Sequence, residues 1–541
     1  MGGRMMADES ARDWRAAAQR DLPLGVVRVV TRDDALRDPA LATGYLPSRL
    51  LVSTLLPGDH PARTTLAELV AELGWALEPG TPTFASRPGR LERADLRLRR
   101  ARTLTEPPEV TKERLTRYPW AAGTLGTERL RLVKATPASA TPDAWEVLSL
   151  ARERGLELPG VGLEHVGFLA PFHSTNPFHS TNPFHSTNPF HSTNPYEGGG
   201  TPSVEYGFAG SGGRQVVAYI GPDPASVSAK PRGDAVVGIV DTGCGPHPWL
   251  DPVVETAVFA SLGATDPATD PERVPDQLGP LDGMIDDGSG HGTFVAGLVH
   301  QAAPHARIAP VRIAGSDGQW EEQSLVDALA GLALRVEAGE RLDVLNLSLG
   351  YYHETPVRSA FDITVAELLL RLRRAGTVVV CSAGNDSTDR PLFPAAFGPW
   401  NPAPAGGTPW IDPDDGAPLI SVGALNPNGT VALFSNIGPW VQTFAPGAAI
   451  LSTVPTSATG SPFAGGIQAT ASDPVGGLAR ETIDPDDYRG GFGLWSGTSF
   501  AAPVVAGMVA AALQDDPGEP TVARARAAVA SVLERLRRPA P

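Results

Sequence analysis

Cysteines and long apolar runs are scarce in this sequence of 541 residues. The two cysteines, Cys244 and Cys381, cannot form the disulfide framework of a small secreted scaffold. No stretch of about 18 consecutive apolar residues occurs, so we expect no membrane-crossing helix and no membrane partner. The charged N-terminal segment lacks the apolar core of a secretory signal. Together these absences lead us to expect a cytoplasmic protein.

Basic charge is also in short supply, and the deficit is confined to one part of the chain. The formal net charge is −16. Residues 1–170 hold 24 basic and 22 acidic side chains, whereas residues 171–541 hold 20 and 38. A surface that binds nucleic acid needs clustered basic residues. We therefore expect no nucleic-acid partner.

A tandem repeat divides the chain. The hexapeptide PFHSTN occurs four times over residues 171–194, and a decayed copy begins at Pro195. Such a unit cannot bury a core, so we predict an extended linker over residues 171–200. The repeated histidines suit either a metal-binding or pH-sensing tract or a duplicated spacer. We favour the spacer and assign no metal ligands, because metal sites usually need ligands in fixed geometry. The histidines concerned are His173, His179, His185 and His191.

Residues 1–170 are predicted to form a small α+β domain. Apolar alternation predicts strands, and helical spacing predicts two helices, the first capped by Thr64 or Thr65 and the second ending at Gly155. The order is β-α-β-β-α-β, the split arrangement of ferredoxin-like domains. The expected elements are a strand at 49–52, a helix at 64–77, strands at 96–102 and 129–135, a helix at 143–155 and a strand at 161–169.

The remainder reads as a connector, a larger domain and a terminal helix. Residues 201–233 form the connector, with one expected strand at 215–220, and residues 516–541 are expected to form the C-terminal helix. Over residues 234–515, short runs rich in Val, Ile and Leu alternate with helix-like segments. Such runs indicate a buried, mostly parallel sheet with helices on both faces, hence an α/β fold.

Three polar residues stand at expected strand ends and helix starts of the larger domain. Asp241 ends an apolar strand, His291 lies between two glycines at a helix start, and Ser499 begins a helix of small residues. Alone, each has an ordinary structural explanation: a capped strand end, a core histidine, a helix cap. A serine nucleophile, however, needs a base, and the base needs an acid to hold its tautomer. Together the three supply these parts.

A fourth short motif strengthens this interpretation. Residues 377–384 read as a buried strand with its exit, and Asn385 follows. A side-chain amide at such a strand end can donate a hydrogen bond to an oxyanion that develops during acyl transfer.

At this point the sequence resembles the catalytic domain of the subtilisin-like serine proteases. The blocks DTG, HGT, SLG, AGN and GTSFAAP follow in the family order over about half of the chain. The resemblance implies that Asp241 orients His291, that His291 acts as general base and then acid, and that Ser499 attacks the carbonyl. It also implies an oxyanion hole made by Asn385 and the Ser499 backbone amide. One wall of the cleft would be formed by Ser348, Leu349 and Gly350.

The expected function is that of a serine endopeptidase acting on peptide or protein substrates without an organic cofactor. A non-catalytic scaffold or an esterase fits the motifs less well. Two interpretations of residues 1–170 stay open: a propeptide-like inhibitory domain that is removed by self-processing, or a module that binds a regulatory protein partner. Calcium binding is conceivable, but no calcium site can be identified.

Three further features keep alternatives open. Residues 456–490 form a longer insertion than the resemblance leads us to expect, and we favour a solvated loop over a lid. The acidic segment 262–287 could select basic substrate side chains or bind calcium, but we favour a solvated loop. The two cysteines lie in apolar runs, which favours buried structural thiols over redox function.

Overall fold

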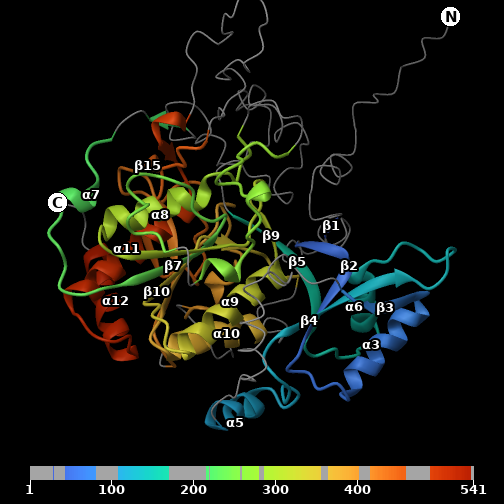
Figure 1. The fold of residues 1–541 in the computed structure, drawn as a ribbon. Helices are drawn as coiled ribbons and strands as arrows, with labels where there is room; N and C mark the ends of the chain where they lie inside the picture. The colour runs from blue at the N-terminus through green and yellow to red at the C-terminus, as the bar shows by residue number, and fades with distance from the viewer. Residues whose placement is uncertain are drawn as a thin grey trace, which may run out of the picture.

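The computed structural model describes residues 28–29, 43–80, 108–169, 215–217, 220–255, 259–278, 285–354, 363–400, 415–458 and 488–537. The predicted linker, the predicted strand at 96–102 and most of the 456–490 insertion lie outside these residues. Within the described part, no helix is both long and apolar enough to span a membrane. We call the described residues 28–169 the N-terminal module and the described residues 215–537 the C-terminal module (Figure 1).

The N-terminal module is an antiparallel sheet with helices. Its strands run in the order β5-β2-β4-β3, and β1 pairs with β2. The β-α-β-β-α-β order is present, with one additional helix, α5, inserted before β4, but its second strand is β3 at Trp75–Pro79 and not the strand predicted at 96–102. The elements are β1 (Arg28–Val29), β2 (Gly44–Ser53), α3 (Pro61–Glu72), β3 (Trp75–Pro79), α5 (Pro108–Arg117), β4 (Thr127–Lys134), α6 (Ala144–Glu153) and β5 (Val161–Leu169).

The first helix departs from its predicted bounds of 64–77. It begins at Pro61, and its cap is His60, whose Nδ1 accepts from the amide of Ala62 at 3.2 Å, rather than Thr64 or Thr65. Proline is favoured in the first helical turn because its missing N–H has no partner there anyway. The helix ends at Glu72, and Gly74 turns the chain with φ of +76°. The residues that follow form strand β3, so the helix assignment of 75–77 was wrong.

The C-terminal module contains the predicted parallel sheet. Its strand order is β14-β13-β12-β10-β7-β8, and every pair is parallel. The strands are β7 (Val236–Asp241), β8 (Arg307–Arg312), β10 (Val344–Leu347), β12 (Val378–Ser382), β13 (Leu419–Leu425) and β14 (Thr443–Pro446). The helices are α7 (Pro224–Val227), α8 (His291–Ala302), α9 (Glu322–Glu337), α10 (Ile363–Arg374), α11 (Thr498–Asp515) and α12 (Val522–Arg537).

Strand β7 shows why this sheet carries helices on both faces. Alternate side chains of a strand point to opposite faces. Val236 and Val240 pack into the cluster that contains the buried side chains of α9 and α10, whereas Val237 and Ile239 pack into the cluster of α8 and α11. Both faces are apolar, so the strand reads as a continuous hydrophobic run. The predicted α/β class is confirmed.

The strand predicted in the connector and the predicted C-terminal helix are both present, each shorter than predicted. The predicted strand at 215–220 is seen as β6 (Gln215–Val217), which pairs with β16 (Phe492–Trp495), and β16 pairs with β15 (Ile450–Thr453). The predicted C-terminal helix is α12, which buries Ala525, Val529 and Val532 in the α8–α11 cluster.

The two modules are joined through strand β5. This strand lies between β9 (Gln319–Glu321) and β11 (Leu349–Gly350) of the C-terminal module and is antiparallel to both. Leu169 pairs with Leu349, and Phe168 pairs with Gly350. The last strand of the N-terminal module therefore extends its own sheet into the C-terminal module (Figure 1).

Candidate active site

Asp241 and His291 meet at the carboxyl end of the parallel sheet. Asp241 is the last residue of β7, and His291 is the first residue of α8. The Asp241 Oδ1 atom lies 2.8 Å from His291 Nδ1, and both side chains are fully buried. The amide of Thr242 also donates to Asp241 Oδ1 at 2.7 Å. In an open parallel sheet, functional groups gather at this edge.

Ser499 lies at the start of α11, which packs against α8. The rings of His291 and Phe500 are 5.3 Å apart, so His291 stands beside the first turn of α11. The Ser499 hydroxyl donates to the backbone oxygen of Ser348 at 3.2 Å. His291 Nε2 has no hydrogen-bond partner within the described part of the chain. The structure thus joins the predicted acid and base directly and holds the serine hydroxyl on Ser348.

A proline inside α11 explains a second contact of Ser348. Pro503 has no N–H, so the backbone oxygen of Ser499, four residues earlier, cannot receive its helical hydrogen bond. The Ser348 hydroxyl donates to that oxygen at 2.7 Å and replaces the missing bond. Asn346 in turn donates to the Ser348 hydroxyl at 2.9 Å. This chain of contacts fixes the start of α11 against the end of β10.

Asn385 is held against the same helix start. Its side-chain oxygen accepts from the Thr498 amide at 2.9 Å and from the Thr498 hydroxyl at 2.8 Å. The amide of Gly384 donates to the Thr498 hydroxyl at 3.0 Å, with φ of +100° at Gly384. This φ is one that glycine adopts readily. The predicted oxyanion residue therefore contacts the residue directly before Ser499.

A buried carboxyl that the sequence did not predict lies behind the Asp241–His291 pair. Glu272 accepts from the hydroxyl of Thr242, from the amide of Gly292 at 3.1 Å and from the hydroxyl of Thr293 at 2.5 Å. It therefore ties the DTG motif to the HGT motif. Burial raises the pKa of Glu272 to about 7, and the hydroxyl contacts act in the opposite direction.

Glu272 is an exception to the solvated loop that we favoured for the acidic segment 262–287. Residues 265–269 are exposed, as expected for such a loop, but Glu272 is 1% exposed. A single glutamate among aspartates gave no periodic signal, because its burial depends on how the loop folds back on the two motifs. Of the two thiols favoured as buried, Cys381 is buried and Cys244 is half-buried. Burial raises the pKa of both thiols, and neither forms a disulfide.

The predicted cleft wall is covered by the chain itself. Ser348, Leu349 and Gly350 are buried, and the last two pair with the end of β5. The amide of Leu169 also donates to the backbone oxygen of Gly318 at 2.8 Å. An extended segment of this chain thus lies along the wall where substrate was expected to bind.

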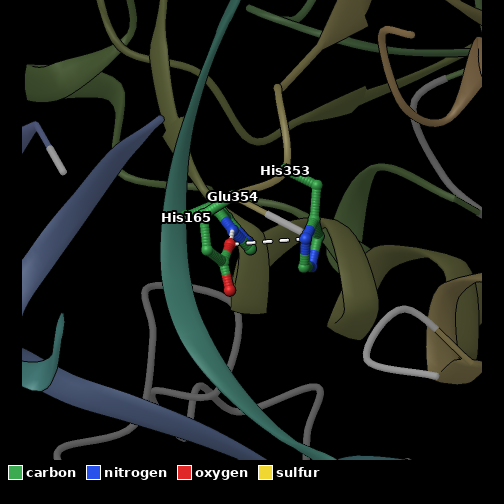
Figure 2. Close-up of side chains that lie close together, drawn as sticks. All are labelled: His165, His353 and Glu354. Carbon is green, nitrogen blue, oxygen red and sulfur yellow. Dashed lines mark hydrogen bonds and ion pairs between the residues drawn. The ribbon is translucent and has the colours of Figure 1, made fainter. Parts of the chain in front are cut away.

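A group of ligand-type side chains forms at the junction of the modules, although we assigned no metal ligands. His165 of β5 meets His353 and Glu354, which follow β11 (Figure 2). Single residues on separate strands and loops carry no spacing signal, so the sequence could not reveal this group.

These features define an α/β protein with a buried Asp–His pair beside a serine at a helix start. Comparison with known proteins gives the family: the profile of the Subtilase family, Peptidase_S8, matches residues 232–535, more than half of the chain. The chain belongs to the subtilase family.

Individual relatives share modest identity with this chain. Subtilase-type proteinase RRT12 of Saccharomyces cerevisiae is 32% identical over 30% of each chain. Subtilisin NAT of Bacillus subtilis subsp. natto is 26% identical over 49% of this chain and 55% of its own length. The major intracellular serine protease of Bacillus subtilis (strain 168) is 27% identical over 41% of this chain and 61% of its own length. The chain therefore spans from less than a third to about three fifths of the length of these relatives.

A solved cold-adapted subtilisin-like serine proteinase aligns with 58% of this chain and 86% of its own at 21% identity, with a TM-score of 0.33.

Proposed function

We propose that this chain is a serine endopeptidase whose nucleophile is Ser499, whose base is His291 and whose orienting acid is Asp241. The 2.8 Å contact between Asp241 Oδ1 and His291 Nδ1 carries the proposal, because it fixes the tautomer in which Nε2 is the basic atom. Nε2 has no competing partner among the described residues. Family membership supports the assignment.

The reaction requires one rotation before the chemistry. The Ser499 hydroxyl leaves the backbone oxygen of Ser348 and donates to His291 Nε2. His291 then takes the proton as Oγ forms a bond to the substrate carbonyl carbon. The same proton passes to the leaving amine as the peptide bond breaks, which leaves an acyl-enzyme that water hydrolyses by the reverse proton route.

Negative charge on the carbonyl oxygen is stabilised by two donors. One is the Asn385 amide nitrogen, since the Asn385 oxygen is taken by Thr498. The other is the Ser499 backbone N–H in the first turn of α11, where the helix dipole favours negative charge.

We propose further that the N-terminal module inhibits the peptidase by occupying its cleft. A peptide substrate would bind as an added antiparallel strand along Leu349 and Gly350, and β5 already lies there. The next residue back along that wall is Ser348, which contacts Ser499. The carboxyl end of β5, at Leu169, is therefore the end that lies nearest Ser348, which makes the peptide bonds after Leu169 the candidate site of self-processing.

Buried charges hold the inhibitory module in register. Glu321 of β9 accepts from Arg49 at 2.7 Å and from Arg129 at 2.6 Å, and both arginines belong to the N-terminal module. Arg129 also pairs with Glu164 of β5. A buried pair that loses one partner costs several kcal/mol, so these contacts favour this docking over shifted alternatives.

The test is the intact mass of the purified chain beside Ser499→Ala. We expect the wild type to be cut shortly after residue 169 and the variant to remain intact. An intact wild type that hydrolyses peptides fully would refute inhibition by the module. An intact, inactive wild type would favour the alternative, in which a protein partner engages residues 1–170 and switches the peptidase on. Cutting of Ser499→Ala would remove Ser499 from the nucleophile role.

A further inference from the structure

The junction between the modules contains a buried set of imidazole and carboxylate groups that the proposed peptidase chemistry does not use. One ligand-type atom from each of His165, His353 and Glu354 lies within 4.8 Å of the other two. His165 Nε2 is 2.8 Å from Glu354 Oε2, and His353 Nδ1 is 3.3 Å from the same oxygen. All three side chains are buried, and they converge on one point (Figure 2).

We propose that this group is a binding site for a divalent transition-metal ion of the zinc type, shared between the two modules. His165 comes from the N-terminal module, whereas His353 and Glu354 come from the C-terminal module. Two imidazoles and one carboxylate form a donor set that suits zinc, whereas calcium and magnesium prefer oxygen ligands. A fourth position would be filled by water.

The surroundings of His165 match those of a metal-bound histidine. Its second ring nitrogen, Nδ1, lies 2.6 Å from Glu322 Oε2. Metal-binding histidines usually donate this second N–H to a carboxylate, which fixes the tautomer and directs Nε2 to the metal. Glu322 begins α9 in the C-terminal module, so the contact also spans the junction.

Charge and space favour an occupant. Glu322 and Glu354 are 7% and 0% exposed, and Arg152 lies 3.5 Å from Glu354. Buried carboxylates need a compensating positive charge. A cavity of about 20 Å³, enough for one water molecule, borders His165, Glu322 and His353, while Glu354 is not among its lining residues. Ligand atoms around zinc lie roughly 3.4 Å apart, so binding requires shifts on the order of 1 Å.

A proton is the competing occupant. Burial alone would lower the pKa of His165, but the charge of Glu322 and hydrogen bonds to Glu322 and Glu354 outweigh it and raise this pKa well above its usual value. A protonated His165 would also balance the two carboxylates. The experiment must therefore detect the metal itself and its ligands.

The test uses the full chain with Ser499→Ala, so its outcome does not depend on catalysis. The linker histidines His173, His179, His185 and His191 are replaced by asparagine, because they could bind metal on their own. The chain is stripped with a chelator and titrated with Co²⁺, whose visible absorption reports tetrahedral coordination, and then with Zn²⁺. We expect one ion per chain, displacement of Co²⁺ by Zn²⁺, and a rise in melting temperature on binding.

Substitutions identify the ligands. We expect His165→Asn and His353→Asn each to abolish stoichiometric binding, and Glu322→Gln to weaken it by about 10- to 100-fold. His305→Asn, which lies outside the junction, should bind as the parent does. The proposal is overturned if the parent chain binds neither Co²⁺ nor Zn²⁺. It is also overturned if His165→Asn or His353→Asn binds the metal as tightly as the parent does. If circular dichroism shows that a histidine variant does not fold, the test rests on Glu322→Gln. A metal affinity of Glu322→Gln equal to that of the parent then overturns the proposal.

Discussion

The docking of β5 can be loosened at a single glycine. A Cβ atom added at Gly167 would lie 2.0 Å from Cζ2 and 2.3 Å from Cε2 of Trp320. Trp320 is 1% exposed and packed among core side chains, so the ring has little room to move. Gly167→Ala therefore places a methyl group where the C-terminal module already has an aromatic ring.

The expected size of the effect follows from overpacking. Forcing an extra methyl group into a packed site typically costs about 1–3 kcal/mol. The clash exists only when β5 is docked, so the cost falls on docking and not on either module alone. Because about 1.4 kcal/mol corresponds to a tenfold change in an equilibrium constant, the docking equilibrium of the N-terminal module weakens by roughly 5- to 150-fold.

The assay compares the full chain, Gly167→Ala and Gly58→Ala with a short chromogenic peptide substrate. Gly58 lies in the same module, and a Cβ there meets no atom within 4 Å, so it serves as the matched control. We expect higher peptidase activity for Gly167→Ala only. Equal activity of all three proteins, at equal extents of self-processing, would show that β5 does not limit access to the cleft.

Three further predictions concern the site itself. Ser348→Ala leaves the buried Ser499 backbone oxygen without its donor, so in a Ser499→Ala background it should lower the free energy of unfolding by about 1–3 kcal/mol in urea titration; no change would contradict the role given to this hydroxyl. Asn385→Ala should lower kcat by about 10²–10³, as loss of this donor does in a subtilisin, with little change in KM; an effect on KM alone would make Asn385 a binding residue. The raised pKa of Glu272, about 7, means that the folded state keeps a proton that the unfolded state has released above its usual pKa of 4.5. This contribution to stability is complete below about 4.5 and is lost as pH rises through about 7, by up to roughly 3 kcal/mol. Glu272→Gln in the Ser499→Ala background should therefore reduce the decrease of melting temperature between about pH 4.5 and pH 7. An unchanged decrease would show that a group other than Glu272 causes it.

The sequence was most informative where function depends on short, local patterns. Asp241, His291, Ser499 and Asn385 each stand at a strand end or helix start that apolar periodicity locates. In the N-terminal module, four elements of the β-α-β-β-α-β order were predicted close to their observed places, β2, β4, α6 and β5, but the second strand, β3, was predicted at 96–102 and not at Trp75–Pro79. The first helix was misplaced because Pro61 and His60 set its start, and two threonines inside the helix resembled caps.

Contacts between distant segments were not predictable. Glu272 gains its role from a loop that returns to Thr242 and Thr293, and the spacing of neither motif requires it. Strand β5 was expected, but nothing in its alternation showed that its end pairs with β11. The junction histidines meet only because that pairing forms.

Ser348 links the substrate wall to the proposed nucleophile, Ser499, through two hydrogen bonds. Its hydroxyl supplies the hydrogen bond that Pro503 denies to the Ser499 backbone oxygen, so the start of α11 stays fixed against β10. Its backbone oxygen holds the Ser499 hydroxyl, which must turn from there to reach His291 Nε2. The backbone position of the nucleophile is therefore set in advance, and only one side-chain rotation separates this resting arrangement from the reactive one. The glycine substitution in β5 tests access to the cleft, whereas Ser348→Ala tests whether that preset position is maintained.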